Sequence, residues 1–153
     1  MRTAVTLCLL LAGALALRAQ ADTVVTVTQL EEAKALADST DAAILAVFAG
    51  SDWCRPCKMF KRGVLEDDAF RRGAAGEVVV LYLDFPAKRR NALPAAQTAH
   101  NEALAERYNP TGSFPKLVLL DPAEAKLAEL EFAGQDAEAF VAELRSASGA
   151  ERR

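Results

Sequence analysis

The sequence is poor in the residues on which most catalytic sites and small secreted scaffolds depend. Its 153 residues include only three cysteines and one histidine, His100. So few cysteines exclude a miniprotein held together by disulfides. A Ser/His/Asp arrangement and a glycine-rich phosphate loop are both missing from the sequence. The sequence therefore gives no sign of a triad hydrolase or of a nucleotide-binding enzyme.

The chain also lacks an apolar run long enough to cross a membrane. The longest such run lies between Arg2 and Arg18 and is about 15 residues long, whereas a spanning helix needs roughly 20. A positive start, an apolar centre and the ending Ala19-Gln20-Ala21 are typical of a secretory signal peptide. We therefore predict that residues 1–21 are a cleaved leader, that residues 22–153 form the working domain, and that the protein is exported to the periplasm or secreted.

Neither acidic nor basic residues are in large excess. The 18 basic residues face 21 acidic ones, and loss of Arg2 and Arg18 would leave 16 against 21, so the net charge would change from −3 to −5. A mildly acidic chain is a poor partner for nucleic acid or for an anionic membrane. A mature chain of 132 residues has the length of one domain. We expect a monomer that does not bind nucleic acid, whose main partner is not an anionic membrane, and whose mature chain has no membrane span.

The order of the expected elements is that of a single α/β domain. We predict strands over 23–27, 42–49, 77–83, 116–120 and 127–132, and helices over 28–37, 54–65, 67–75, 94–108 and from 136 onward. The alternating last strand should pair antiparallel with the strand before it. This order describes a central mixed sheet, mostly parallel, that is flanked by helices on both faces.

Local signals mark three helix ends. The segment Thr28–Glu31 (TQLE) has the pattern of a capping box, so Thr28 should cap the first helix. Asp136 should cap the last helix. The tail Ser146–Arg153 follows the last apolar positions of that helix and should fray.

The cysteines carry the main functional signal. Cys8 lies within the predicted leader, so the working domain keeps Cys54 and Cys57, in the motif Trp-Cys-Arg-Pro-Cys. An exported protein meets oxidising conditions, in which this pair can form a disulfide. Closing so short a loop would stabilise the fold by only about 2 kcal/mol, and two thiols are too few for a usual zinc site. We interpret the pair as redox-active; a passive disulfide and a metal-binding pair are the alternatives.

The spacing of the two cysteines suits thiol–disulfide exchange. If Cys54 begins a helix at the end of a buried strand, the unpaired N–H groups and the positive end of that helix favour its thiolate. The thiolate is the species that attacks a disulfide. Cys57 then lies one turn along the same side, where it can resolve a mixed disulfide. Pro56 suits the first helical turn, in which its missing N–H costs little.

The residues beside the cysteines either shape this site or belong to ordinary surface. Arg55 adds a positive charge that should favour the thiolate. Trp53 either shades the sulfurs from water or is only an aromatic anchor. Lys58, Lys61 and Arg62 are expected on a solvated helix face.

Two features further along the chain have plain interpretations. The basic cluster Lys88–Arg90 is expected to be solvated loop surface, with a docking site for an acidic partner as the alternative. His100 lies at the edge of an apolar helix stripe, and we expect it to be structural rather than catalytic.

Three segments of the sequence resemble the thioredoxin superfamily. They are residues 48–58 (FAGSDWCRPCK), 113–121 (SFPKLVLLD) and 132–134 (FAG), and their order and spacing extend the resemblance over residues 23–147. The lead-in to the cysteines and the basic loop after Asp84 are similar to those of exported bacterial thioredoxin-like proteins. This combination is far more specific than a lone Cys-x-x-Cys.

The resemblance implies a thioredoxin-like fold in which Pro115 is a cis-proline that faces the dithiol. A cis X–Pro bond costs only about 0.5–1 kcal/mol relative to trans. In this family the backbone before that proline, here Phe114, pairs with an extended substrate chain, and the loop excludes metal from the dithiol. An ordinary proline at the start of a strand is the alternative. Gly134 either borders the same groove or forms a turn into the last helix.

The sequence departs from the thioredoxin pattern at two places. Thioredoxins bury an acidic residue below the dithiol as a proton relay, often with a lysine, but the matching positions here hold Val47 and Val80. Asp52 is too near the surface to replace that acid. The dipeptide Arg55-Pro56 stands where thioredoxin has Gly-Pro. Since this dipeptide tunes the reduction potential between about −270 and −120 mV, the retained Pro56 favours the reducing half of that range.

We therefore predict an exported thiol–disulfide oxidoreductase, more a reductase than an oxidant, that needs no cofactor or metal beyond the Cys54–Cys57 couple. The residues expected to shape its site are Trp53, Arg55, Pro56, Phe114 and Pro115. Its expected partners are cysteine-containing proteins of the same compartment and a second redox protein that supplies or accepts electrons. A binding module of the same fold and a copper chaperone that uses the two thiols are the alternatives.

Overall fold

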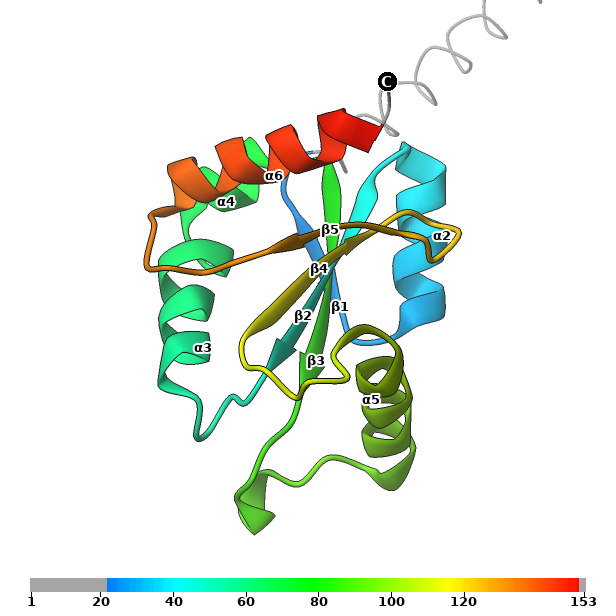
Figure 1. Ribbon diagram of the computed structural model, residues 1–153, viewed down its shortest axis with the longest axis vertical. Helices are drawn as coiled ribbons and strands as arrows, with labels where there is room; N and C mark the ends of the chain where they lie inside the picture. Colours follow the sequence, from blue (N-terminus) through cyan, green and yellow to red (C-terminus); the bar gives the residue numbers. More distant parts are fainter. Residues whose placement is uncertain (1–21, 152–153) are drawn as a thin grey trace, which may run out of the picture.

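A five-stranded sheet runs through the centre of the molecule (Figure 1). The computed structural model describes residues 22–151, so the predicted leader, residues 1–21, lies outside the described residues. In chain order the strands are β1 (Val25–Val27), β2 (Ala43–Ala49), β3 (Val78–Asp84), β4 (Lys116–Leu120) and β5 (Lys126–Leu130). Their order across the sheet is β1-β3-β2-β4-β5. Each strand begins and ends within two residues of the strand predicted from the sequence.

The sheet is mixed, as predicted, but it is not mostly parallel. β1 and β2 pair parallel with β3, whereas β4 pairs antiparallel with both β2 and β5. The expectation was wrong for β4, and α5 (Ala95–Tyr108) gives the reason. This helix lies beside the end of the sheet toward which β2 and β3 run (Figure 1). The chain therefore re-enters the sheet from that end, and β4 runs in the opposite direction to β2.

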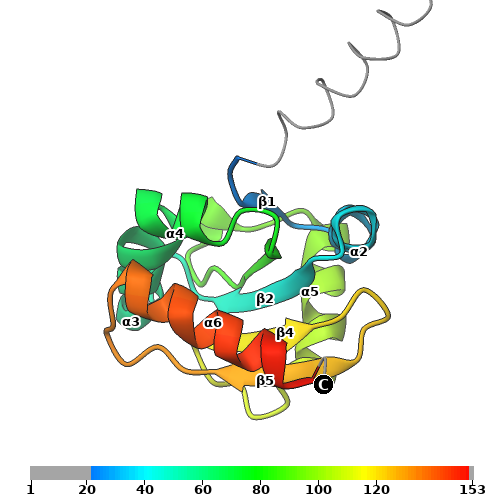
Figure 2. The same cartoon turned by 90° about the horizontal axis from the view of Figure 1, so that it is seen from above.

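Helices cover both faces of the sheet, as predicted (Figure 2). α2 (Leu30–Thr40) and α5 pack on one face. The elements of the other face are α3 (Arg55–Phe60), its π-helical continuation η2 (Lys61–Leu65), α4 (Asp68–Gly73) and α6 (Ala137–Glu151). A short 3-10 turn, η3 (Arg89–Asn91), interrupts the loop before α5. Within residues 22–151, no helix is long and apolar enough to span a membrane.

The buried strand β2 contributes side chains to two hydrophobic cores. Every residue of this strand is buried, and alternate side chains point to opposite faces. Val47 belongs to the core beneath α3 and α6, and Phe48 belongs to the core beneath α2 and α5. Cys54 and Cys57 are part of the first core. The same apolar layer that holds the sheet to its helices therefore also holds the two cysteines.

The start of α2 differs from the predicted capping box. The helix begins at Leu30, and the residue at its N-cap, Gln29, makes no capping hydrogen bond with its side chain, so Thr28 is not the cap. Instead, the backbone N–H of Leu30 donates to Nε2 of His100 on α5, 3.1 Å away. This contact confirms the structural role expected for His100. Asp136 does cap α6, as predicted.

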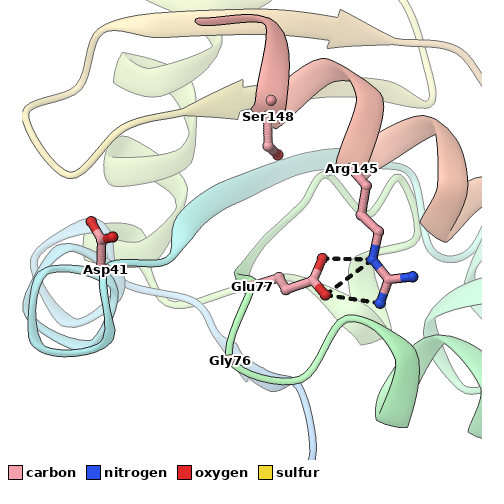
Figure 3. Close-up of a pocket in the computed structure, with 6 residues that line it drawn as sticks. Asp41, Gly76, Glu77, Arg145 and Ser148 are labelled. Atoms are coloured by element: carbon pink, nitrogen blue, oxygen red, sulfur yellow. Dashed lines mark hydrogen bonds and ion pairs between the residues drawn. The ribbon is translucent and has the colours of Figure 1, made fainter. Parts of the chain in front are cut away.

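The last helix extends further than predicted. α6 continues to Glu151, so the expectation that the chain frays from residue 146 was wrong for the residues up to 151. Arg145 braces the helix, because it donates to the Glu77 carboxylate at 2.8–3.0 Å and to the Gly73 carbonyl at 2.7 Å. Figure 3 shows this ion pair at a shallow hollow. The hollow lies where β2 and β3 begin, at the end of the sheet opposite the cysteine motif.

Candidate active site

Cys54 lies where β2 gives way to α3. Residues 50–53 follow the strand, and Cys54 then occupies the N-cap position of the helix with extended backbone angles (φ −80°, ψ 106°). Cys57 lies in the first turn, and the structure joins the two sulfurs in a disulfide with an S–S distance of 2.03 Å. Only 4% of Cys54 and 2% of Cys57 is exposed. The pair singled out in the sequence is thus held at a helix start and is nearly shielded from water.

The first turn of α3 directs a hydrogen-bond donor at Cys54. The backbone N–H of Cys57 donates to Cys54 Sγ at a distance of 3.2 Å. Pro56 provides no N–H, and its ring restrains the backbone of the same turn. When the disulfide is reduced, a negative sulfur at this position meets an N–H group and the positive end of the helix, which together lower the pKa of a cysteine. Arg55, which is exposed, adds a positive charge next to Cys54 in the chain.

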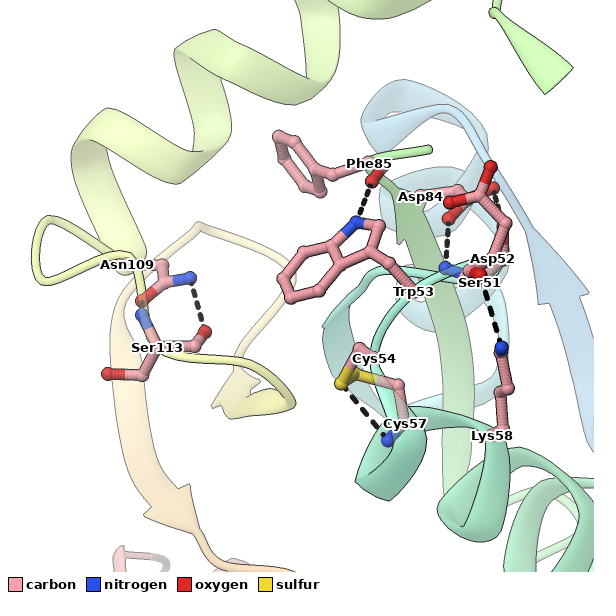
Figure 4. Close-up of a disulfide and its surroundings, with 10 residues drawn as sticks. All are labelled: Ser51, Asp52, Trp53, Cys54, Cys57, Lys58, Asp84, Phe85, Asn109 and Ser113. Atoms are coloured by element: carbon pink, nitrogen blue, oxygen red, sulfur yellow. Dashed lines mark hydrogen bonds between the residues drawn. A yellow bond between two sulfur atoms is a disulfide. The ribbon is translucent and has the colours of Figure 1, made fainter. Parts of the chain in front are cut away.

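Trp53 connects three segments beside the disulfide. Its indole Nε1–H donates to the carbonyl of Phe85, just after β3, at 2.8 Å. Its ring meets the ring of Phe114 edge-on, with 5.2 Å between the centroids, and Phe114 also lies 5.4 Å from the ring of Phe85. Figure 4 shows the indole beside the disulfide with its N–H directed toward Phe85. Although 48% of Trp53 is exposed, its position is fixed by a hydrogen bond and an aromatic contact.

The loop before β4 has the backbone that the resemblance implies. The peptide bond between Phe114 and Pro115 is cis. The contact between Phe114 and Trp53 places this loop beside the disulfide. The alternative of an ordinary trans proline at the start of a strand is therefore wrong.

A buried asparagine holds the loop in place. Asn109 is 3% exposed, and its side chain both donates to the Ser113 carbonyl at 2.8 Å and accepts the Ser113 N–H at 3.0 Å. The pattern of the sequence predicts only that the helix ends at residue 108 and does not indicate this role of Asn109. The available signal was an asparagine at the end of a helix and before a proline, since asparagine side chains often organise such turns through their own backbone contacts.

The Asp52 carboxylate ties the lead-in of the cysteine motif to the loop after β3. It accepts the backbone N–H groups of Ala87 at 2.9 Å and Lys88 at 3.0 Å, and the side-chain amide of Asn91 at 2.8 Å. These hydrogen bonds, that of Ala87 first among them, lower the pKa of Asp52 to about 2. The carboxylate is therefore ionised, and accepts all three hydrogen bonds, at any ordinary pH. On the other side, Lys58 Nζ donates to the Asp52 carbonyl at 3.1 Å.

A second carboxylate supports the same lead-in from the end of β3. Asp84 accepts the Ser51 N–H at 2.9 Å and the Ser51 hydroxyl at 2.6 Å. The carbonyl of Asp84 in turn accepts the side-chain amide of Asn101, which is buried on α5. Figure 4 shows Ser51, Asp52 and Asp84 together on one side of the disulfide. Neither supporting role is visible in the sequence, because each joins residues more than 30 positions apart.

The layer below the dithiol is apolar. Val47 and Val80 are fully buried there, as valines at these positions predicted. Tyr82 faces Val47 across the β2–β3 pair, and burial raises the pKa of its hydroxyl to about 12, so it is no base at neutral pH. Among the described residues, the only polar side chains that are buried are Asn101 and Asn109. Within residues 22–151, no three His, Cys, Asp or Glu side chains gather as a metal site would require.

Comparison with known proteins identifies the family. A family model described as thioredoxin-like matches residues 25–122. The chain belongs to the thioredoxin-like family. The disulfide bond reductase DsbH of Chlamydia pneumoniae is 34% identical to it over 104 residues, which are 68% of this chain and 61% of that protein. The chain thus matches less than two thirds of the length of this relative.

Solved structures of other thioredoxin-like proteins have the same architecture. A structure of a DsbH oxidoreductase superposes with a TM-score of 0.73 at 28% identity, over 83% of this chain and 86% of the other. A thioredoxin from Thermus thermophilus superposes with a TM-score of 0.60 at 23% identity, over 82% of this chain and 88% of the other. The thioredoxin-like fold with a central mixed sheet, expected from the sequence, is confirmed.

Replacement of Gly50 by alanine should displace Trp53. A Cβ atom at Gly50 would lie 2.3 Å from Trp53 Cε2, so the indole would have to leave Phe85 and Phe114. We expect the free energy of unfolding to fall by about 1–3 kcal/mol and the fluorescence of Trp53, the only tryptophan, to shift to longer wavelength.

Gly63→Ala is the matched control for this prediction. No atom lies within 4 Å of a Cβ at Gly63, so alanine there should be neutral or should stabilise the helix by up to about 1 kcal/mol. Unchanged emission and stability in Gly50→Ala would contradict the fixed position of the indole.

Proposed function

We propose that this protein exchanges disulfides with other proteins through Cys54 and Cys57, and that it acts mainly as a reductase. The observation that carries the proposal is the position of Cys54 at the N-cap of α3, where its sulfur accepts the Cys57 N–H. The cis Phe114–Pro115 loop beside the disulfide and the relationship to the disulfide bond reductase DsbH support the same reaction.

The reaction begins with the reduced protein. The Cys54 thiolate attacks one sulfur of a substrate disulfide, so that the substrate S–S bond breaks, a Cys54–substrate disulfide forms, and the other substrate sulfur leaves as a thiolate and takes up a proton from water. The Cys57 sulfur then loses its proton and attacks Cys54 Sγ. The mixed disulfide breaks, the Cys54–Cys57 disulfide forms, and the substrate is released with two thiols. Two electrons have passed to the substrate, and a second redox protein must return the disulfide to the dithiol.

The apolar layer below the dithiol affects the second step. No buried carboxylate of the described residues lies there to accept the proton of Cys57. In this proposal the proton passes to water or to the departing substrate thiolate.

The residues around the dithiol divide the remaining tasks. Arg55 favours the thiolate by its charge, and Pro56 holds the first turn of α3. Trp53 limits the access of water to the sulfurs. The backbone of Phe114, before the cis Pro115, offers hydrogen-bonding groups to an extended substrate chain, as an exposed strand edge does for a peptide.

The reducing direction and the cellular location are parts of the same proposal. Pro56 matches the proline of reducing thioredoxins, and the related protein is named a disulfide bond reductase. We also propose that residues 1–21 direct export and are removed, so that residues 22–153 act on cysteine-containing proteins in the periplasm.

Serine variants of the two cysteines separate an exchange enzyme from a passive binding module. The mature protein should reduce a protein disulfide when dithiothreitol is supplied. Cys54→Ser should abolish this activity because the attacking sulfur is lost, whereas Cys57→Ser should accumulate mixed disulfides with substrate through Cys54. Full activity of Cys54→Ser, measured as the rate of substrate thiol release, would rule out the assigned nucleophile.

The direction of electron flow can be read from an equilibrium with glutathione. We expect the Cys54–Cys57 couple to have a reduction potential of about −250 mV, close to the value of about −270 mV for thioredoxin. The measurement is the fraction of disulfide after equilibration in defined ratios of reduced and oxidised glutathione. A reduction potential of about −130 mV would instead indicate a disulfide donor and would contradict the reductase assignment.

A further inference from the structure

An exposed basic turn lies beside the dithiol. Its three residues, Lys88, Arg89 and Arg90, are consecutive, are all exposed and enter the short 3-10 turn η3. We call residues 88–90 the basic turn. Several other exposed cations form ion pairs within 4.0 Å, as Arg72 does with Asp68, although Arg55, Arg62 and Arg71 form none within residues 22–151. Across residues 22–151, no ion pair of that kind involves the basic turn.

The turn is held next to the cysteines by Asp52. The carboxylate of Asp52 accepts the backbone N–H groups of Ala87 and Lys88 and the side-chain amide of Asn91, which bracket the turn on both sides. None of these hydrogen bonds uses a charged group of the turn, although the Asp52 carboxylate also attracts the charge of Lys88. Asp52 precedes Cys54 by two residues, and two Cα–Cα steps span at most about 8 Å. The turn is thus hydrogen-bonded to a residue whose Cα lies within about 8 Å of the Cα of Cys54.

The charge of the turn contrasts with that of the whole chain. The net charge of the chain is −3, yet the surroundings of the dithiol also contain the cations Arg55 and Lys58. Charges act over a Debye length of about 8 Å at physiological ionic strength. The basic turn can therefore attract acidic groups of a substrate that come within such a distance of it while the substrate disulfide is at Cys54.

The surroundings of the turn fit a protein better than another polyanion. The negative net charge of the chain opposes binding to nucleic acid or to an anionic membrane surface. The half-exposed Trp53 donates to the carbonyl of Phe85, three residues before the turn, and its ring meets the cis Phe114–Pro115 loop; these groups suit a polypeptide. The chemistry of the partner is thus that of a protein segment with a disulfide and with carboxylates near it.

We propose that the basic turn, held in place by Asp52, selects protein disulfides whose flanking residues are acidic. The inference rests on the proposed disulfide exchange and adds the substrate class to it. Asp52 is a positioning residue in this scheme, because it acts through the turn and not on the substrate. Electrostatic attraction of this kind raises association rates by roughly tenfold to a thousandfold and weakens steeply with salt.

The test compares two disulfide-bonded peptides that differ only in having glutamate or glutamine on both sides of the cystine. The quantity measured is the ratio of kcat/KM for the acidic peptide to kcat/KM for the neutral one, with dithiothreitol as reductant. The wild-type ratio should be about ten or more at low salt and should approach one in about 1 M salt, where the Debye length is about 3 Å. The triple variant Lys88→Gln, Arg89→Gln, Arg90→Gln should have a ratio near one at every salt concentration.

A matched triple variant controls for the change in net charge. Arg71→Gln, Arg72→Gln and Lys126→Gln remove the same number of positive charges from exposed positions. These residues lie at the other end of the sheet, since Arg71 contacts the segment before β1 and Lys126 pairs with the end of β4. This control should keep the wild-type ratio.

Asp52→Asn separates the position of the charges from their presence. It keeps all three cations but cannot accept both backbone N–H groups as a carboxylate does, so the ratio should fall several-fold toward that of the triple variant. Its far-ultraviolet circular dichroism and its melting temperature show whether the domain stays folded. An unchanged ratio in folded Asp52→Asn would overturn the positioning role of Asp52.

The other outcomes distinguish the inference from the proposed function. If the wild type reduces both peptides equally well, or if the triple variant keeps the preference, the inference fails while disulfide exchange stands. If the wild type reduces neither peptide, the proposed function fails and the inference falls with it. Sedimentation with vesicles of anionic phospholipid that is lost in the triple variant would assign the turn to a membrane surface and would overturn the protein partner.

Discussion

The hydrogen bond from the Cys57 N–H to Cys54 Sγ connects the packing of this protein to its chemistry. It exists because β2 is buried along its whole length and delivers Cys54 to the start of α3, and because Cys57 and Phe60 anchor that helix in the core. A helix that began one residue earlier or later would direct its free N–H groups elsewhere. The apolar layer below therefore fixes the electrostatic surroundings of the sulfur, although it contributes no charge of its own.

Polar side chains that accept hydrogen bonds from loop backbone hold the remaining parts of the site in place at the end of the sheet. Asp52 and Asp84 each hold the lead-in to the cysteines, and Asn109 holds the loop before the cis-proline. Trp53 then links these segments through Phe85 and Phe114. Each of these side chains accepts one or more hydrogen bonds from backbone N–H groups of a loop that has no strand partner, as buried or half-buried polar groups require. Support of this kind is what the proposed exchange reaction requires of the groups around Cys54.

The sequence was sufficient for the elements and for the pair of sulfurs, because both depend on short-range patterns. The all-apolar run of β2, the spacing of Cys54 and Cys57, and the Phe114-Pro115 dipeptide are visible along the chain. Contacts between distant segments are not visible along the chain. The cap of α2 comes from His100 rather than from Thr28, and the direction of β4 follows from where α5 lies. α6 continues to Glu151, and its Arg145 pairs with Glu77, a residue far away in the sequence.

The supporting residues of the site show the same limit. Asp52 is expected from the sequence to lie too near the surface to replace the buried acid of thioredoxins, and its structural role is a different one: its carboxylate accepts hydrogen bonds from three donors in a loop more than 30 residues away. Nothing in the segment around Asp52 indicates which donors will fold onto it. The sequence predicts that the basic turn is solvated surface. Only its hydrogen bonds to Asp52 connect it with the cysteine motif.

The ionisation of Cys54 tests the central claim most directly. In Cys57→Ser the backbone N–H at position 57 is retained and Cys54 is the only cysteine of residues 22–153, so the rate of its alkylation by iodoacetamide can be followed against pH without a second thiol. We expect an inflection well below the pKa of about 8.5 of a free cysteine, together with fast reaction at neutral pH. An inflection at or above that value, with slow reaction, would show that the helix start does not activate the sulfur and would contradict its role as the attacking group.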